Sequence, residues 1–301
     1  MPTLEALLNS RHSIELVISQ PDRPSGRGLD VQISAVKQLA QQRGLAIIQP
    51  EKIRNNDVLQ RQLESLAPDA IVVVAYGRLI PPWMLQLPRY GNLNLHASLL
   101  PKYRGAAPIQ WAVANGETET GVTTMRLDAG LDTGEILLQK HVPISPDETS
   151  VELSPVLAAV GARLMLQTLD GLEAGTLLPQ AQDHGLATAA PILQREDGHI
   201  DFTRTANQIY NRWRGFQPWP GAFSFFRGKK LIVNAMRVAA DGTQPDSPAP
   251  GTLLREERRL FAYCGRNTWL ELLEVQMEGK RRMAVDAFLN GFSFTPGERL
   301  E

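Results

Sequence analysis

The chain has 301 residues and a mass of 33.3 kDa, which is enough for two domains of ordinary size. Its 43% hydrophobic and 21% charged residues exclude a disordered chain, and the single cysteine, Cys264, excludes a disulfide framework or a cysteine zinc cluster. The net charge of −1 argues against a uniformly basic nucleic-acid-binding protein, but residues 1–193 carry 15 basic against 19 acidic side chains, and residues 194–301 carry 16 against 13. No apolar run is long enough for a membrane span, so we expect a cytoplasmic protein.

Short apolar runs alternate with helical stretches over residues 1–175, a pattern typical of an α/β domain around a mostly parallel sheet. We expect strands at residues 14–19, 45–49, 70–75, 93–96, 121–127 and 135–144. We expect helices at residues 34–43, 57–66 and 108–115. A longer helix should begin at a capping box formed by Thr149 and Glu152 and end at Gly175.

Residues 176–193 lose this periodicity and are rich in Pro, Gln, Ala and Gly, which indicates a linker. Beyond it, residues 194–301 begin with a short helical stretch at 205–213. Strand-like runs separated by Gly and Pro turns follow at residues 222–226, 231–238, 259–264 and 269–275. This pattern predicts a small β-barrel as the second domain.

Asn94 and His96 are the first candidates for chemistry. Two residues apart on a strand, they share one face near its carboxyl end, where open α/β sheets bind ligands. An imidazole transfers protons near neutral pH, and an amide N–H stabilises a developing oxyanion. From spacing alone, a core Asn and His bonded to the backbone is an equally good interpretation.

The turn 128–134 supplies a carboxylate, Asp132, that could approach such a histidine. A carboxylate beside an imidazole orients it and raises its basicity. Asp and Gly are also ordinary turn formers, so the turn alone favours a structural role.

The chain contains the motifs Asn94-x-His96, Ser98-Leu-Leu-Pro-x-Tyr-Arg-Gly105, Leu131-Asp132-Thr-Gly134, Gln20-Pro-Asp-Arg-Pro-Ser-Gly-Arg-Gly28, Ala75-Tyr-Gly-Arg-Leu-Ile-Pro81, Gly105-Ala-Ala-Pro-Ile-Gln110 and Pro218-Trp-Pro-Gly-Ala222. Together these motifs resemble the folate-dependent formyltransferase family. The resemblance covers nearly the whole chain. It implies a Rossmann-like formyltransferase domain at 1–175 with a mostly parallel sheet, a linker at 176–193, and an OB-like, tRNA-binding barrel at 194–301.

The resemblance implies transfer of the formyl group of 10-formyltetrahydrofolate to the α-amino group of methionine on the initiator tRNA. By resemblance, Asn94 and protonated His96 stabilise the oxyanion, while Asp132 keeps His96 charged and helps to move protons. The implied folate contacts are Arg78, Leu79, Ile80, Ser98, Leu99, Leu100, Pro101, Ala129 and Gly130. Arg78 is equally well interpreted as a solvated charge, because the pterin contact needs only its backbone. Neither the histidine spacing nor the resemblance indicates a metal.

Basic residues in both parts of the chain are candidate tRNA contacts. Arg23 and Arg27 lie in a loop that, in this family, inserts toward the acceptor end of initiator methionyl-tRNA. The candidates in the second domain are Arg212, Arg214, Lys229 and Lys230. Each basic run alone is typical of a solvated surface. We expect a monomer that does not bind membranes.

The chain departs from the family pattern in two places. Members begin with a strand and a Gly-Thr-Pro-type loop before the helix that opens here at Met1, so we expect a longer native protein. The linker has Thr188-Ala-Ala-Pro-Ile192 in place of a Thr-Tyr-Ala-x-Lys pattern. The alternatives are a related enzyme acting on a sugar nucleotide or on water, and an inactive nucleic-acid-binding remnant. A nicotinamide dehydrogenase is disfavoured, because Gly26-Arg-Gly28 lacks the third glycine.

Overall fold

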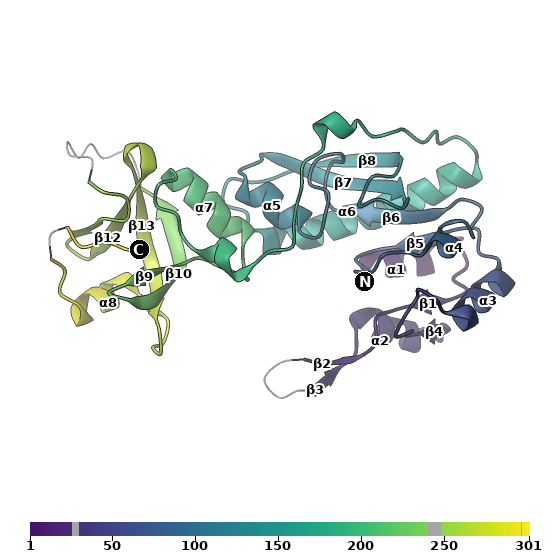
Figure 1. Ribbon diagram of the computed structural model, residues 1–301, viewed down its shortest axis with the longest axis horizontal. Helices are drawn as coiled ribbons and strands as arrows, with labels where there is room; N and C mark the ends of the chain where they lie inside the picture. The colour runs from purple at the N-terminus through teal and green to yellow at the C-terminus, as the bar shows by residue number, and fades with distance from the viewer. Residues whose placement is uncertain (26–29, 240–247, 296) are drawn as a thin grey trace. The chain divides into compact units, whose positions relative to one another are not determined.

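The computed structural model describes residues 1–25, 30–239, 248–295 and 297–301 (Figure 1). Arg27, a candidate tRNA contact, lies outside these ranges. The chain forms two compact units, each assembled from more than one stretch. Unit 1 comprises Met1–Pro108, Glu119–Pro143 and Ser154–Pro191, and unit 2 comprises Ile109–Thr118, Ile144–Leu153 and Ile192–Glu301.

The first half of the chain alternates strands and helices, as its periodicity predicts. The strands are β1 (Val17–Ile18), β2 (Arg23–Ser25), β3 (Asp30–Gln32), β4 (Ile47–Ile48), β5 (Ile71–Val73), β6 (Asn92–His96), β7 (Glu119–Arg126) and β8 (Ile136–Pro143). The helices are α1 (Pro2–Leu8), α2 (Ala35–Gln42), α3 (Asp57–Leu66), α4 (Pro82–Leu85), α5 (Pro108–Ala114), α6 (Ser150–Glu173) and the 3₁₀ turn η1 (His184–Leu186).

Helix starts follow the capping residues in the sequence. Ser34 accepts a bond from the Lys37 amide at the start of α2. At the start of α6 the Thr149 amide donates to Glu152 Oε2 at 2.9 Å, and the Glu152 amide donates to Thr149 Oγ1 at 3.4 Å. These reciprocal bonds confirm the predicted capping box.

The sheets of unit 1 are mixed, which corrects the expectation of a mostly parallel sheet. β1 and β4 form a parallel pair of their own, and a second sheet has the order β5-β6-β7-β8. Only β5 and β6 are parallel in this second sheet, while β6–β7 and β7–β8 are antiparallel. The glycine-containing turn 128–134 joins β7 directly to β8, and so short a connection reverses the chain.

One face of this sheet packs against α6. Leu93 and Leu137 share a buried cluster with Met165, Leu169 and Leu172 of the helix. A Cβ at Gly161 would lie 2.6 Å from Leu95 Cδ2, so glycine lets the helix approach the sheet closely. Leu93 thus faces the core, and its neighbours Asn92 and Asn94 point to the opposite side of β6.

Unit 2 contains a six-stranded antiparallel sheet. Its strands are β9 (Phe223–Phe226), β10 (Lys229–Val238), β11 (Leu253–Glu256), β12 (Arg259–Cys264), β13 (Thr268–Met277) and β14 (Met283–Ala284), in the order β11-β12-β13-β10-β9 with β14 on β13. The helices are η2 (Arg195–Gly198), α7 (Ala206–Gly215), η3 (Gly265–Asn267) and α8 (Val285–Gly291). In the described residues β9 and β11 do not pair, so the closed barrel that the sequence predicts is not found there.

Residues 298–301 instead hydrogen-bond to both edges of this sheet. On one side, the amide of Leu253, the first residue of β11, donates to the Glu298 carbonyl at 2.8 Å. On the other side Glu301 and Phe225 of β9 exchange two backbone bonds of 3.0 Å. Between them, the Leu300 side chain is 2% exposed and belongs to the core of unit 2. Across the described ranges, no helix has the length and apolar character to cross a bilayer.

Candidate active site

Asn94 and His96 lie toward the carboxyl end of β6, an interior strand of the four-stranded sheet of unit 1. His96 is 6% exposed, whereas Asn94 is half-buried. Among the described residues, no hydrogen bond is formed by the Asn94 side chain, so its amide is available to a ligand. The alternation of β6 places the imidazole and the amide on one face, as the sequence predicts.

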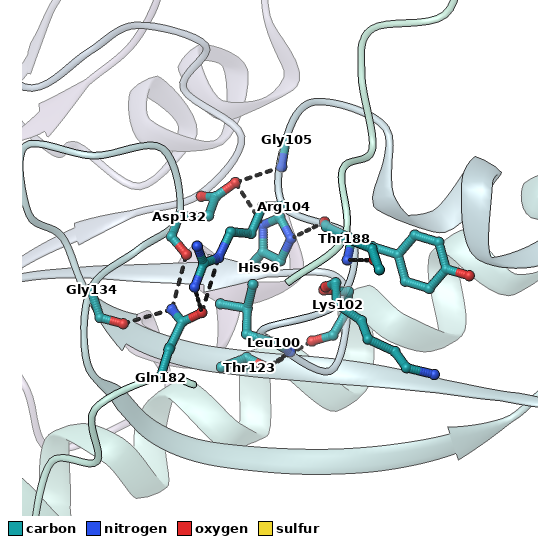
Figure 2. Close-up of polar contacts among 12 residues, drawn as sticks. His96, Leu100, Lys102, Arg104, Gly105, Thr123, Asp132, Gly134, Gln182 and Thr188 are labelled. Carbon is teal, nitrogen blue, oxygen red and sulfur yellow. Dashed lines mark hydrogen bonds and ion pairs between the residues drawn. The ribbon is translucent and has the colours of Figure 1, made fainter. Parts of the chain in front are cut away.

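The His96 ring lies between the loop after β6 and the turn after β7 (Figure 2). His96 Nε2 is 2.8 Å from the carbonyl oxygen of Tyr103, and because a carbonyl only accepts, Nε2 carries a proton. His96 Nδ1 is 3.6 Å from Asp132 Oδ2. That distance fits an ion pair but is too long for a hydrogen bond. The structure thus brings together the histidine and the carboxylate that the sequence separates by 36 positions.

Asp132 is held in a partly buried position. Its Oδ2 accepts the Gly105 amide at 2.8 Å, and its side chain is 11% exposed. This hydrogen bond fixes the orientation of the carboxylate. Asp132 also has a φ of +53°, in the left-handed region that is unfavourable for a residue with a side chain. The turn therefore needs outside support to hold this conformation.

The loop after β6 is fixed by side chains from neighbouring strands. Thr123 Oγ1 donates to the Ser98 carbonyl at 2.6 Å and accepts the Leu100 amide at 3.1 Å. Gln139 Nε2 donates to the Leu100 carbonyl at 2.8 Å. These contacts satisfy the backbone of the loop on its sheet side and keep it rigid.

The residues expected to contact folate have different environments. Leu79 is 79% exposed, and Ala129 and Gly130 are exposed on the turn that contains Asp132. Ile80 packs into a core cluster, and Ser98 and Leu100 are buried. For Leu99 and Pro101 the side chains are half-buried.

Arg78 is not a freely solvated charge. Its Nη1 donates to the carbonyl oxygens of Pro50 and Glu51, at 3.2 and 2.7 Å. Arg78 and Arg23 also line a surface hollow of about 650 Å³, together with Gly77. Two guanidinium groups at one hollow favour an anionic ligand there.

The basic candidates of the second half differ in accessibility. Arg214 is 3% exposed, and its guanidinium donates to the carbonyls of Ser145 and Glu148 and to Asn211 Oδ1. Burial lowers the pKa of Arg214. Because Nη1 and Nη2 of Arg214 are bonded inside unit 2 and the side chain is buried, Arg214 has little surface left for a tRNA phosphate.

The other three candidates keep some exposed surface. Arg212 is half-buried, donates to the Asp197 carbonyl at 3.1 Å and lies over the Phe216 ring. Lys230 Nζ lies 3.7 Å from the centre of the Phe223 ring, whereas the side chain of Lys229 is exposed. Arg23 is exposed as well. Among the described residues, no cluster of three or more His, Cys, Asp or Glu side chains could hold a metal ion.

Gln182 is the residue at the site that sequence reasoning missed. It is 6% exposed, and its Nε2 donates to the main-chain oxygens of Asp132 and Gly134, at 2.9 and 2.7 Å (Figure 2). Its Oε1 accepts Nε and Nη2 of Arg104, at 3.1 and 2.6 Å. No signal in the aperiodic segment 176–193 distinguishes this glutamine from its neighbours.

Comparison with known proteins defines the class. Residues 2–169 match the formyl transferase family, and residues 192–293 match the formyl transferase C-terminal domain. The chain therefore belongs to the formyl transferase family. Within it, the chain is 60% identical to methionyl-tRNA formyltransferase of Acidobacterium capsulatum, over 100% of this chain and 96% of that protein. It is 52% identical to methionyl-tRNA formyltransferase of Koribacter versatilis, over 100% and 95% of the two chains.

Solved structures support the fold. An N-formyltransferase from Helicobacter canadensis, in complex with folinic acid and dTDP-3-aminofucose, superposes with a TM-score of 0.65. It is 18% identical to this chain, and the match covers 91% of this chain and 94% of that one. At this identity the match establishes the shared architecture and no more.

Proposed function

We propose that this protein transfers the formyl group of 10-formyltetrahydrofolate to the α-amino group of methionine on initiator methionyl-tRNA, in the cytoplasm, for translation initiation. The observation that carries the proposal is the His96–Asp132 pair beside the unengaged Asn94 amide, at the carboxyl end of β6. Relatives that are 60% and 52% identical over the whole chain carry the name of this activity.

The three side chains have distinct roles in this proposal. The amine attacks the formyl carbon of 10-formyltetrahydrofolate, which places negative charge on the formyl oxygen. Collapse of this tetrahedral intermediate breaks the bond between the formyl carbon and N10, and N10 takes up a proton as tetrahydrofolate leaves. The Asn94 amide has no competing partner among the described residues and donates to that oxygen. His96 adds a positive charge, although its Nε2–H is shared with the Tyr103 carbonyl. Asp132, oriented by the Gly105 amide, stabilises that charge and accepts a proton from the amine, directly or through water.

The formyl donor is proposed to lie against residues 78–80, 98–101 and 129–130. Leu79 and Leu131 support this placement, because they are 79% and 63% exposed on the loops concerned. Sites for small molecules combine apolar side chains with a few polar backbone groups, and both loops offer this combination. We propose that the reaction needs no metal.

For the tRNA, the proposal keeps Arg23, Arg212, Lys229 and Lys230 as phosphate contacts. Arg23 lines the same hollow as Arg78, where anionic ligands are favoured. Lys229 is exposed, and Arg212 and Lys230 reach the surface in part. We propose that a monomer binds one tRNA.

The test is an acceptor comparison. The purified protein is incubated with 10-formyltetrahydrofolate and, separately, with methionyl initiator tRNA, a dTDP-amino sugar, or no acceptor. We expect formylmethionine only with the charged tRNA. Faster formylation of the amino sugar, or formate release without an acceptor, would assign the protein to another activity of the same family. Tight tRNA binding without any formyl transfer would identify an inactive binding protein.

A further inference from the structure

The segment 180–190 is a strap across the candidate active site and not a simple spacer. Gln180 exchanges two backbone bonds of 2.8 Å with Ile136 of β8. Thr188 accepts the Tyr103 amide on its Oγ1 and the Arg104 amide on its carbonyl, both at 2.8 Å. Since the Tyr103 carbonyl binds His96, this end of the strap supports the histidine side of the site. Gln182, between these anchors, supports the carboxylate side.

The Gln182 side chain has all its polar groups engaged. Its two N–H donors bond the main-chain oxygens of Asp132 and Gly134, and its oxygen accepts two N–H groups of Arg104. An amide has two donor hydrogens and two acceptor lone pairs, so these four contacts use its whole capacity. A buried amide satisfied in this way rigidifies what it joins.

What Gln182 joins is the turn that carries Asp132. The left-handed φ of +53° at Asp132 needs support, and Gly134 already packs tightly, because a Cβ there would lie 1.8 Å from the Arg126 oxygen. Gln182 thus holds the carbonyl oxygens of Asp132 and Gly134, while Gly134 also packs against the backbone of Arg126 in β7.

Arg104 closes a ring of contacts around the catalytic pair. Its guanidinium is bound by Gln182, and the next residue, Gly105, donates its amide to Asp132 Oδ2. Asp132 is therefore connected to the loop after β6 in two ways: its carbonyl oxygen through Gln182 to Arg104, and its carboxylate directly to the Gly105 amide (Figure 2). Loss of either connection would change the 3.6 Å distance between Asp132 Oδ2 and His96 Nδ1.

We propose that Gln182 is a positioning residue for formyl transfer, which acts through Arg104 and the Asp132 turn to set the Asp132–His96 distance. This inference rests on the proposed function. Gln182 does not need to touch either substrate in this role. Its loss should therefore lower kcat and leave KM for both substrates nearly unchanged.

The experiment compares Gln182→Ala and Gln182→Glu with Gln180→Ala. The control removes the same side chain two residues earlier, where it is exposed. Gln182→Glu keeps the volume but turns two donors toward the carbonyls of Asp132 and Gly134 into acceptors. We expect both Gln182 variants to lose about tenfold or more in kcat with KM within about twofold, and Gln180→Ala to match the wild type.

A double-mutant cycle tests whether the effect passes through Asp132. In an Asp132→Asn background, Gln182→Ala should reduce kcat by less than about twofold, because residues of one network are not additive. Equal losses in the two backgrounds, or a change confined to KM, would overturn the proposal. Arg104→Lys keeps the positive charge but loses the bidentate hydrogen bond to Gln182 Oε1, so its kcat should fall as in Gln182→Ala. This variant replaces Gln182→Ala in the test if Gln182→Ala does not fold.

Amide hydrogen exchange in the free protein gives a readout that is independent of turnover. In Gln182→Ala the Gly105 amide, bound to Asp132, should exchange faster relative to the Leu100 amide, bound to Thr123 in the same loop. An unchanged ratio would overturn the proposal. If the wild type forms no formylmethionine, the proposed function fails, while the exchange ratio still decides whether Gln182 positions Asp132.

Discussion

Replacing Asp132 with asparagine removes one negative charge and preserves the local bonds. An asparagine oxygen can still accept the Gly105 amide, and Gln182 bonds only main-chain oxygens of the turn. What is lost is the attraction that the proposed mechanism places between this carboxylate and a protonated His96 ring, whose Nδ1 lies 3.6 Å from Asp132 Oδ2. With an effective dielectric constant of about 20, that attraction is worth about 4.6 kcal/mol as an upper limit. We therefore expect kcat to fall between about 100-fold and 1000-fold.

The assay is formylation of methionyl initiator tRNA with both substrates saturating, and the matched control is Asp128→Asn. Asp128 lies exposed in the same turn and accepts bonds from the Gly130 amide and Thr133 Oγ1, with no contact to His96. The control should retain kcat within about threefold, because it removes the same charge away from the reacting groups. A loss below tenfold in Asp132→Asn, or equal losses in the two variants, would refute the electrostatic role of Asp132.

Three further predictions concern stability and tRNA binding. Hydrogen bonds and ion pairs with Arg259 and Arg237 lower the pKa of buried Glu271 from 4.5 to about 2, so its contribution is complete above pH 4.5 and is lost as the pH falls toward 2. Since both arginines are half-exposed and screened, Glu271→Gln should cost about 2 kcal/mol at pH 7 in urea unfolding, and wild type and variant should converge near pH 2. Leu300→Ala should destabilise unit 2 by about 2–4 kcal/mol, and a calorimetric loss under about 1 kcal/mol would contradict the buried position. Arg23→Ala should weaken tRNA binding and reduce the slope of log K against log salt by about 1, whereas an unchanged slope would exclude a phosphate contact.

Local signals in the sequence predict most elements of this fold. Helix α3 spans the predicted residues 57–66, and the capping box at Thr149 is present, because both depend on contacts within a few residues. The direction of β7 relative to β6, in contrast, does not depend on local contacts. Apolar periodicity shows that a strand exists but not which neighbour it pairs with or in which sense, so the mixed sheet was not predictable from it.

The candidate site was predictable where its residues share a strand or a turn. Asn94 and His96 follow from alternation, and Asp132 from its turn. The positions of Gln182 and Arg214 were not predictable. Gln182 is a buried polar residue in an aperiodic segment, and Arg214 is a buried charged residue in a basic run typical of an exposed surface. Both positions are set by hydrogen-bond partners distant in sequence, which a single chain's pattern does not encode.

The pairing of residues 298–301 with both β9 and β11 has a consequence for biosynthesis. Strand edges that lack partners are templates on which other chains can add. While the chain is being made, β9 and β11 leave the ribosome before residues 298–301, so the parts of both edges that these residues cover stay open until they have been synthesised. Chains released early by stalled translation would keep these edges, and we expect such fragments to aggregate or to be degraded preferentially.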